Sequence, residues 1–310
     1  MISERMRALP RNSFIALIRF AISDLRYSFA ATAVSNFPVS KPRYISPRRR
    51  QASSSSSSIF ARSLLANVVV FPILAVLLTT PVHLPREVLI GVLLMAAAPG
   101  VPFLPRMAAA AKGNLIFAID LMIALQAVSV VTTPVTLNLI LPVEDAVKVP
   151  VLRTIATLVL FQLLPLALGM LVRDRAAQHA AAIAKPVSAL STLGLIGTVV
   201  FLIVPHLNVL AKVAGGGALM SILLLVVVAW PIGWVLGGPE VSIRKILAIG
   251  TSLRNVGLCL LIATREFPDT GVATAVTAYF LIQAVANLVY AKYLGRGPER
   301  EMAEAPGRPS

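Results

Sequence analysis

One arginine lies in the middle of a long apolar stretch of this sequence. Arg254 is about ten residues from either end of the stretch 243–264 and is followed by Asn255. If the stretch spans a membrane, a guanidinium at that depth must face protein or water and needs a partner, because an unpaired charge there is costly. Two interpretations follow: an internal tie between helices, or a contact with a bound substrate.

An acidic residue occupies a second apolar stretch. Asp120 lies about one and a half turns into the stretch 114–141, and Arg106 stands in the same half of the preceding stretch. Depth alone suggests a pair between Asp120 and either Arg106 or Arg254. A carboxylate inside a membrane is also a candidate proton-coupling group.

Two of the apolar stretches are interrupted. The stretch 86–111 contains Pro99, Gly100, Pro102 and Pro105, which remove backbone donors and cannot sustain one continuous helix. The stretch 243–264 contains glycines on both sides of Arg254. Two interrupted helices, five spans apart, are what an inverted-repeat transporter needs, in which the broken helices cross at the midplane. Backbone broken at that depth is tolerated only in contact with protein or water.

These residues must be positioned by a set of apolar helices. Hydrophobic residues make up 57% of the 310 residues, charged residues 13%, and the mean hydropathy is +0.84. This charge content is too small to cover a water-facing surface, so a soluble enzyme and a disordered protein are nearly excluded. We predict an all-α polytopic membrane protein with eight spans, at about 61–80, 86–111, 114–141, 151–172, 183–204, 217–237, 243–264 and 270–293.

Basic residues are distributed unevenly between the connectors. With a cytoplasmic amino terminus, the inside connectors carry ten Lys and Arg residues and the outside connectors five. The positive-inside rule therefore predicts that both termini are cytoplasmic, and we expect a multi-pass protein of the cell membrane.

Residues 1–60 differ in composition from the rest. Residues 1–62 hold eleven basic residues and only two acidic ones, and a run of serines occupies 53–58. We predict a largely disordered, basic, Ser-rich extension with an interfacial amphipathic helix near Phe14–Phe29. A transit peptide and a misplaced start are the alternatives. The transporter domain is predicted over 61–294, followed by a disordered cytoplasmic tail over 295–310.

Other kinds of chemistry find little support. Cys259 is the only cysteine and the three histidines lie far apart, so the sequence predicts no disulfide framework, metal site or cofactor. No paired intramembrane carboxylates or Ser/His arrangement suggests an enzyme. The net charge of +15 is concentrated in the amino-terminal extension, which argues against nucleic-acid binding.

Three stretches resemble the bile acid:sodium symporter family. Ala98-Pro99-Gly100 followed by Ala111-Lys112-Gly113-Asn114 is similar to the first crossover helix and the turn after it. The stretch 253–258 resembles the second crossover helix, and 67–72 the helix before the first, where Gln is common at position 67. The resemblance implies ten helices in two inverted five-helix repeats, with a core and a panel domain. The eight spans match helices three to ten.

The resemblance also implies sodium sites from which this chain departs. The matching positions carry almost no side-chain oxygen: Leu104, Pro105, Ala118, Met122, Gly250 and Arg254. Sodium needs several oxygen ligands, by analogy with calcium and magnesium. A guanidinium at position 254 can take the place of the cation and offer a planar fork to a carboxylate, sulfonate or phosphate.

The sequence therefore predicts a secondary transporter of small organic anions, not coupled to sodium. The predicted substrate-binding residues are Arg254, Asn255, Pro99, Gly100, Arg106 and Asn67, with Asp120 as a coupling group. The alternatives are a degenerate, non-transporting family member acting as scaffold or sensor, and a sodium-coupled symporter. The expected partners are the substrate and the lipid bilayer, and a homodimer is left open.

Overall fold

The computed structural model describes residues 58–100, 102–141, 149–203, 208, 211, 213, 215, 217–268 and 270–303. Within these residues the regular structure is helical. The predictions for the amino-terminal extension concern residues 1–60, of which 1–57 lie outside the described residues.

The helices follow the predicted order of spans. The first runs from Ser58 to Thr79 and includes the π-helical turn η1 (Ala66–Val70) and α4 (Phe71–Thr79). It is followed by α5 (Arg86–Ala97), α6 (Leu104–Ala110), α7 (Leu115–Ile140), α8 (Val151–Leu158), the π-helical turn η2 (Val159–Leu163), α9 (Leu164–Arg175), α10 (Ala177–Ile203), α12 (Ala218–Leu236), α13 (Val241–Ser252), α14 (Val256–Glu266) and α15 (Val272–Ala303).

Five of the described helices are long and apolar enough to cross a membrane: Ser58–Thr79, Leu115–Ile140, Val151–Val172, Ala218–Leu236 and Val272–Arg296. The predicted spans 86–111 and 243–264 are each divided into two shorter helices, α5 with α6 and α13 with α14. The all-α polytopic membrane fold is thus confirmed. The relation between two inverted repeats stays a prediction.

The carboxy-terminal helix is longer than expected. Helix α15 continues to Ala303, so the predicted disordered tail is wrong for residues 295–303. Pro298 lacks the N–H that would bond to the Leu294 carbonyl four residues earlier, and Lys245 of α13 donates to that carbonyl instead at 2.8 Å. Residues 304–310 lie outside the described part.

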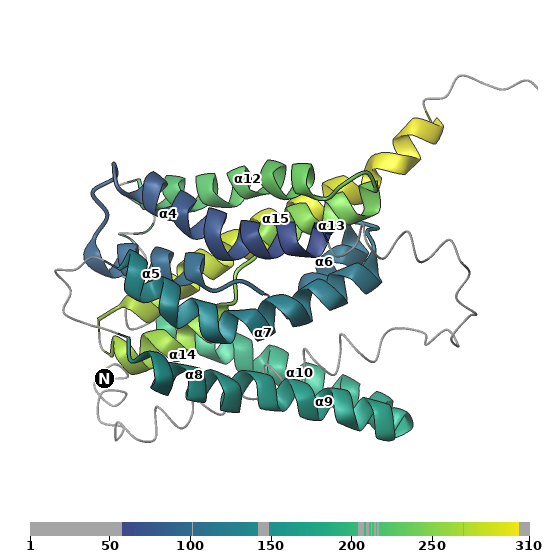
Figure 1. Ribbon diagram of the computed structural model, residues 1–310, viewed down its shortest axis with the longest axis horizontal. Coiled ribbons are helices and arrows are strands. Elements are labelled where there is room, and N and C mark those ends of the chain that lie inside the picture. Colours follow the sequence, from purple (N-terminus) through teal and green to yellow (C-terminus); the bar gives the residue numbers. More distant parts are fainter. Residues whose placement is uncertain are drawn as a thin grey trace, which may run out of the picture.

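The helices form two groups (Figure 1). Helices α8, α9 and α10 lie together along one edge, whereas α4 and α12 lie along the opposite edge, with α7 and α14 between them. The closest crossings use glycine. A Cβ on Gly91 would lie 2.7 Å from Ala275 of α15, and a Cβ on Gly233 would lie 2.3 Å from the Leu247 carbonyl oxygen of α13. Small residues allow such approach between helices in lipid.

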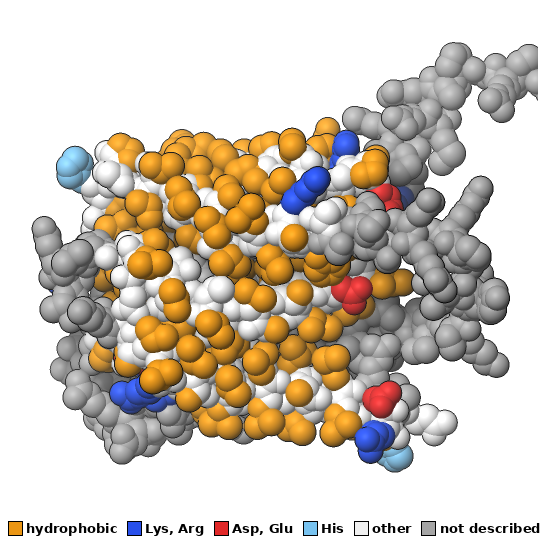
Figure 2. Space-filling view, in the orientation of Figure 1, with side chains coloured by type: hydrophobic (Ala, Val, Ile, Leu, Met, Phe, Trp, Pro, Cys, Tyr) orange, Lys and Arg blue, Asp and Glu red, His pale blue; other side chains and the backbone are white. Residues whose placement is uncertain are grey.

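The surface is that of a membrane protein. Figure 2 shows apolar side chains over the middle of the visible face, with charged side chains mostly toward its two ends. Large apolar residues are strongly exposed on several helices, for example Leu152 at 83% and Leu139 at 78%. Such a belt needs a lipid environment, because exposing this much apolar surface to water is unfavourable.

Candidate functional site: the crossing of the two broken helices

The two broken helices meet at their interruptions. Between α5 and α6 the residues 98–100 and 102–103 lie outside the helices, and between α13 and α14 the chain is unwound from Leu253 to Asn255. Pro99 and Arg254 form an isolated antiparallel bridge, and the Asn255 N–H donates to the Ala98 carbonyl at 2.9 Å. We call residues 98–103 and 253–255 the crossing. The prediction that two unwound segments face one another is confirmed, whereas their position halfway through the lipid stays a prediction.

Local sequence explains why the helices stop there. Pro99 has no N–H with which to continue α5, and Gly100 adopts a φ of 92°, which favours glycine. A Cβ at Gly100 would also lie 2.8 Å from the backbone nitrogen of Gln126 in α7. On the other side, the Asn255 side chain caps α14 by accepting a hydrogen bond from the Leu258 N–H at 3.2 Å. The geometry of the crossing therefore depends on the residue types at these three positions, proline, glycine and asparagine.

Arg254 is fully buried at the crossing. Its Nη2 donates to the Asn67 Oδ1 at 3.1 Å and also to the Thr251 carbonyl, and its Nη1 donates to the Asn67 carbonyl at 3.3 Å. The guanidinium carbon lies 3.6 Å from the centroid of the Phe71 ring, in a cation–π contact. Arg254 thus ties the second broken helix to the helix Ser58–Thr79.

The backbone of Arg254 is held separately from its side chain. The Gln283 side chain on α15 accepts from the Arg254 N–H at 2.9 Å and donates to the Arg254 carbonyl at 3.0 Å. The side-chain amide of Gln283 therefore bonds to both the N–H and the carbonyl of Arg254, as the backbone of a neighbouring strand would. Without it, these two backbone groups would lack hydrogen-bond partners in an apolar surrounding.

A second buried amide reaches the crossing from the other group of helices. Gln162, in η2, donates to the Gln126 carbonyl at 3.0 Å and to the Ser129 hydroxyl at 3.2 Å. Its Oε1 accepts from the Asn255 side chain at 3.5 Å. Thr133 of α7 donates to the carbonyl of Ala97, where α5 ends, at 2.9 Å. Polar side chains of α7 and η2 therefore line the crossing opposite Asn67.

The predicted site residues fall into two sets. The structure brings together Arg254, Asn255, Asn67, Pro99 and Gly100. The side chains of Arg106 and Asp120, by contrast, are exposed on α6 and α7.

The Arg254 guanidinium is bonded to Asn67 and Thr251, whereas Asp120 is exposed on α7, so an Asp120–Arg254 pair is not formed among the described residues. The role of Asp120 as a coupling group stays a prediction. Depth along a helix does not say which way a side chain faces, and Asp120 is on the outward face of α7.

Several residues of the crossing were missed by the sequence reasoning. They are Gln162, Gln283, Gln126, Ser129 and Phe71. For the four polar residues the available signal was an amide or hydroxyl inside an apolar span, which usually forms a hydrogen bond between helices. Nothing in the sequence distinguishes Phe71 from other apolar residues of its span.

The positions that the resemblance assigns to sodium ligands form an apolar cluster. Leu104, Ala118 and Met122 are buried together with Leu121 of α7. A Cβ on Gly250 would be in van der Waals contact, at 3.4 Å, with the side chains of both Leu104 and Leu121. Aliphatic carbon therefore fills the space beside Gly250, and it offers no oxygen to a cation.

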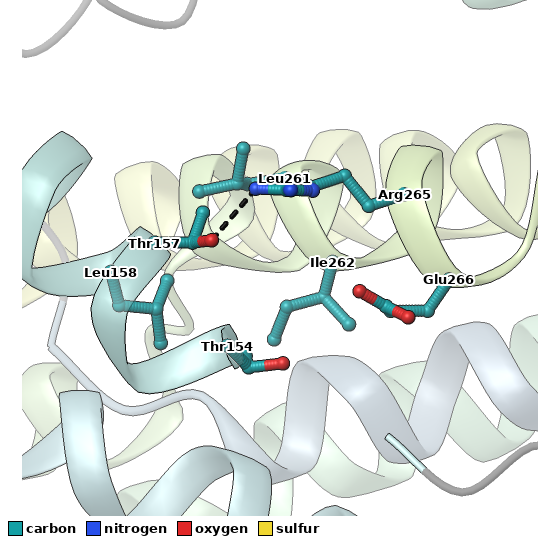
Figure 3. Close-up of a pocket in the computed structure, with 7 residues that line it drawn as sticks. All are labelled: Thr154, Thr157, Leu158, Leu261, Ile262, Arg265 and Glu266. Atoms are coloured by element: carbon teal, nitrogen blue, oxygen red, sulfur yellow. Dashed lines mark hydrogen bonds between the residues drawn. The ribbon is translucent and has the colours of Figure 1, made fainter. Parts of the chain in front are cut away.

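A small pocket lies away from the crossing, between α8 and α14 (Figure 3). Arg265 donates to the Thr157 hydroxyl at 2.7 Å, and Glu266 and Thr154 line the pocket beside Ile262. None of the predicted site residues contributes to this pocket.

Comparison with known proteins identifies the family to which this chain belongs. The sequence model described as the sodium bile acid symporter family matches residues 50–213, more than half of the chain. The chain belongs to the sodium bile acid symporter family. It is therefore a multi-pass membrane transporter of the bile acid/sodium symporter type. No match was found among curated proteins.

The family match includes the first broken helix and ends before the second. The antiparallel bridge between Pro99 and Arg254 joins the matched part of the chain to the part beyond it. Both halves of the crossing are therefore described, although only one lies in the matched range.

Proposed function

We propose that this member of the sodium bile acid symporter family transports small organic anions without sodium. The observation that supports this most strongly is the position of the Arg254 guanidinium. It is buried at the crossing and bonded to Asn67, at a position that the family resemblance assigns to a cation ligand. A fixed positive charge there makes a mobile cation unnecessary and lowers the cost of bringing an anion to the same place.

The substrate would bind on the side of the crossing that Asn255 faces. Asn255, Gln162 and Ser129 offer amide and hydroxyl groups within one hydrogen-bonded cluster. Such groups suit a carboxylate, sulfonate or phosphate, and the nearby positive charge favours anions over neutral analogues. Pro99 and Gly100 contribute unwound backbone, which leaves carbonyl and N–H groups for a ligand.

The packing beside Gly250 supports independence from sodium. Leu104 and Leu121 occupy the space next to this position. A sodium ion at that place would exchange its water shell for methyl groups, which is strongly unfavourable.

The test is uptake into proteoliposomes. Purified protein is reconstituted, and the uptake of labelled bile acid and of labelled small carboxylates and sulfonates is measured in sodium and in choline buffers, with and without a sodium gradient. We expect equal initial rates in both buffers. Uptake that requires sodium and rises with the gradient would show that the protein is a sodium-coupled symporter, and the proposal would then be wrong.

One observation favours a second candidate, a non-transporting scaffold or sensor. Both terminal nitrogens of the Arg254 guanidinium are already bonded to Asn67 and to the Thr251 carbonyl, as an internal tie between helices requires. Arg254→Gln distinguishes the two functions. Loss of transport with intact folding supports the transporter, whereas loss of folding without a transport phenotype supports the scaffold.

The cell-membrane location and the cytoplasmic position of both termini remain part of this proposal. They rest on the distribution of Lys and Arg between connectors. Labelling of cysteines introduced into a Cys259→Ala background, at Arg86 and at Lys292, tests them. We expect an impermeant reagent outside intact cells to label the first position only.

A further inference from the structure

Three buried polar atoms around Arg254 have no hydrogen-bond partner in the described part of the chain. They are Nε of Arg254, Oγ1 of Thr251 and the hydroxyl of Tyr279. All three residues are at most 1% exposed. Buried polar atoms are hydrogen-bonded in the great majority of cases, and an exception requires an explanation such as a bound water or ion. The fourth such atom in the described residues, Oγ1 of Thr154, lies at the pocket between α8 and α14.

The three atoms belong to neighbouring residues. Thr251 is one turn before the end of α13, and its carbonyl accepts from Arg254. Tyr279 is four residues before Gln283 on α15, hence on the same face of that helix, and Gln283 is bonded to the Arg254 backbone. Tyr279 is also close enough to Arg254 for the two side chains to interact electrostatically. Thr251 therefore lies directly beside the guanidinium, and Tyr279 lies within electrostatic range of it.

All three groups can donate a hydrogen bond, and Nε of Arg254 can only donate. The guanidinium also carries a full positive charge, and no carboxylate of the described residues forms an ion pair with it. Carbonyl and amide oxygens and the Phe71 ring stabilise this charge but do not neutralise it. A buried charge without a counter-charge is strongly unfavourable. Donors around a positive charge are the chemistry of an anion site.

We propose that a small monovalent inorganic anion, of the size of chloride, binds between Arg254, Thr251 and Tyr279. A single-atom ion suits these groups, because the three atoms are closed off from solvent and leave no approach for a substrate with many atoms. This site is separate from the organic anion site beside Asn255, and an anion held here would offset part of the Arg254 charge on which the proposed organic anion site relies. The inference does not depend on transport, since it concerns binding to the folded protein.

The experiment measures thermal unfolding of the purified full chain in detergent. Sodium chloride or sodium bromide is titrated at constant ionic strength, which is held with sulfate. We expect the Tm of the wild type to rise with halide and to reach a plateau. Tyr279→Phe and Thr251→Val each remove one donor without changing the shape of the side chain much, and we expect each to need at least about tenfold more halide for half of the effect.

Matched controls remove hydroxyls elsewhere. Tyr290→Phe lies on the same helix, and its ring stacks on Trp230, whereas Thr264→Val removes a hydroxyl bonded within α14. Both should respond to halide as the wild type does. Arg254→Gln should abolish the response, and if this variant does not fold, the two hydroxyl variants still decide the matter.

Two results would overturn the proposal. The first is a wild-type Tm that depends on ionic strength alone, with no difference between halide and sulfate. The second is a halide response that Tyr279→Phe and Thr251→Val share unchanged with the wild type. Either result would leave water as the partner of the three atoms. Because the readout is stability, the result is independent of whether the sodium-free transport proposed above is observed.

Discussion

Replacing Asn67 by alanine tests how the crossing holds its arginine. The substitution removes the Oδ1 that accepts from Arg254 Nη2 at 3.1 Å, whereas the backbone carbonyl that accepts from Nη1 at 3.3 Å remains. One N–H of a buried guanidinium then loses its acceptor. Both residues are fully buried, so no bulk water is at hand to replace it.

The size of the effect follows from this geometry. A hydrogen bond to a charged group contributes about 1.5–3 kcal/mol, and a buried donor left unpaired costs the full desolvation of that group. Asn67→Ala should therefore lower the free energy of unfolding by about 2–3 kcal/mol. In a double-mutant cycle with Arg254→Met, the coupling energy should be about 1.5–3 kcal/mol, because in the Met background Asn67 no longer has this donor to satisfy.

The assay is reversible unfolding by denaturant in micelles, for the wild type, the two single variants and the double variant. A matched control cycle pairs Arg254→Met with Gln283→Ala. The side-chain amide of Gln283 bonds to the backbone of Arg254, which the Met substitution keeps. The control coupling should therefore be under about 0.5 kcal/mol. If the Asn67 cycle gives a coupling as small as the control, Asn67 does not hold the guanidinium and the reasoning fails.

Three further predictions concern packing and helix ends. Gly250→Asp should lower the Tm strongly, and more at alkaline than at mildly acidic pH, because the new side chain enters an aliphatic cluster in which only the ionised form pays the full desolvation cost. Lys245→Met should cost about 1–3 kcal/mol of unfolding free energy, since Lys245 donates to the carbonyl of Ala111 at the end of α6 at 3.1 Å and to that of Leu294 within α15 at 2.8 Å. The exposed Lys292→Met should change it by less than about 0.5 kcal/mol. Gly233→Ala should cost about 1–3 kcal/mol by forcing α12 away from α13, and Gly197→Ala, with no atom within 4 Å of the new methyl group, should be neutral in the same assay.

The length of the apolar stretches and the positions of proline and glycine within them made the fold predictable. Eight stretches of spanning length are separated by polar connectors, and the structure has helices at each of them. The interruption at Pro99 and Gly100 follows from missing donors and a positive φ, both properties of the residue types themselves. The second interruption was indicated by Arg254 and the glycines around it, and the structure places it between Ser252 and Val256.

The partners at the crossing could not be predicted in the same way. Hydrogen bonds such as those of Gln162 and Gln283 join residues far apart in sequence, and they depend on how the helices rotate about their axes. Both faces of α7 are strongly apolar, so the sequence gives almost no periodic signal for the rotation of this helix about its axis. Asp120 faces outward, although its depth along the helix had suggested a partner inside the protein. The π-helical turns leave no mark in the hydrophobic pattern.

Those two turns nevertheless explain how the crossing is held. Consecutive residues of an extended segment point in opposite directions, so Arg254 and Asn255 face opposite sides. The π-helical turns η1 and η2 supply Asn67 to the first and Gln162 to the second. A π turn adds one residue to a helix turn, which exposes backbone and redirects side chains, and such turns are frequent at functional sites. The bond at 3.5 Å from Asn255 to Gln162 is longer than the bond at 3.1 Å from Arg254 to Asn67. The bond from Arg254 is also charge-assisted, whereas the bond from Asn255 joins two neutral amides, so we expect Asn67 to hold its residue of the crossing more strongly than Gln162 holds Asn255.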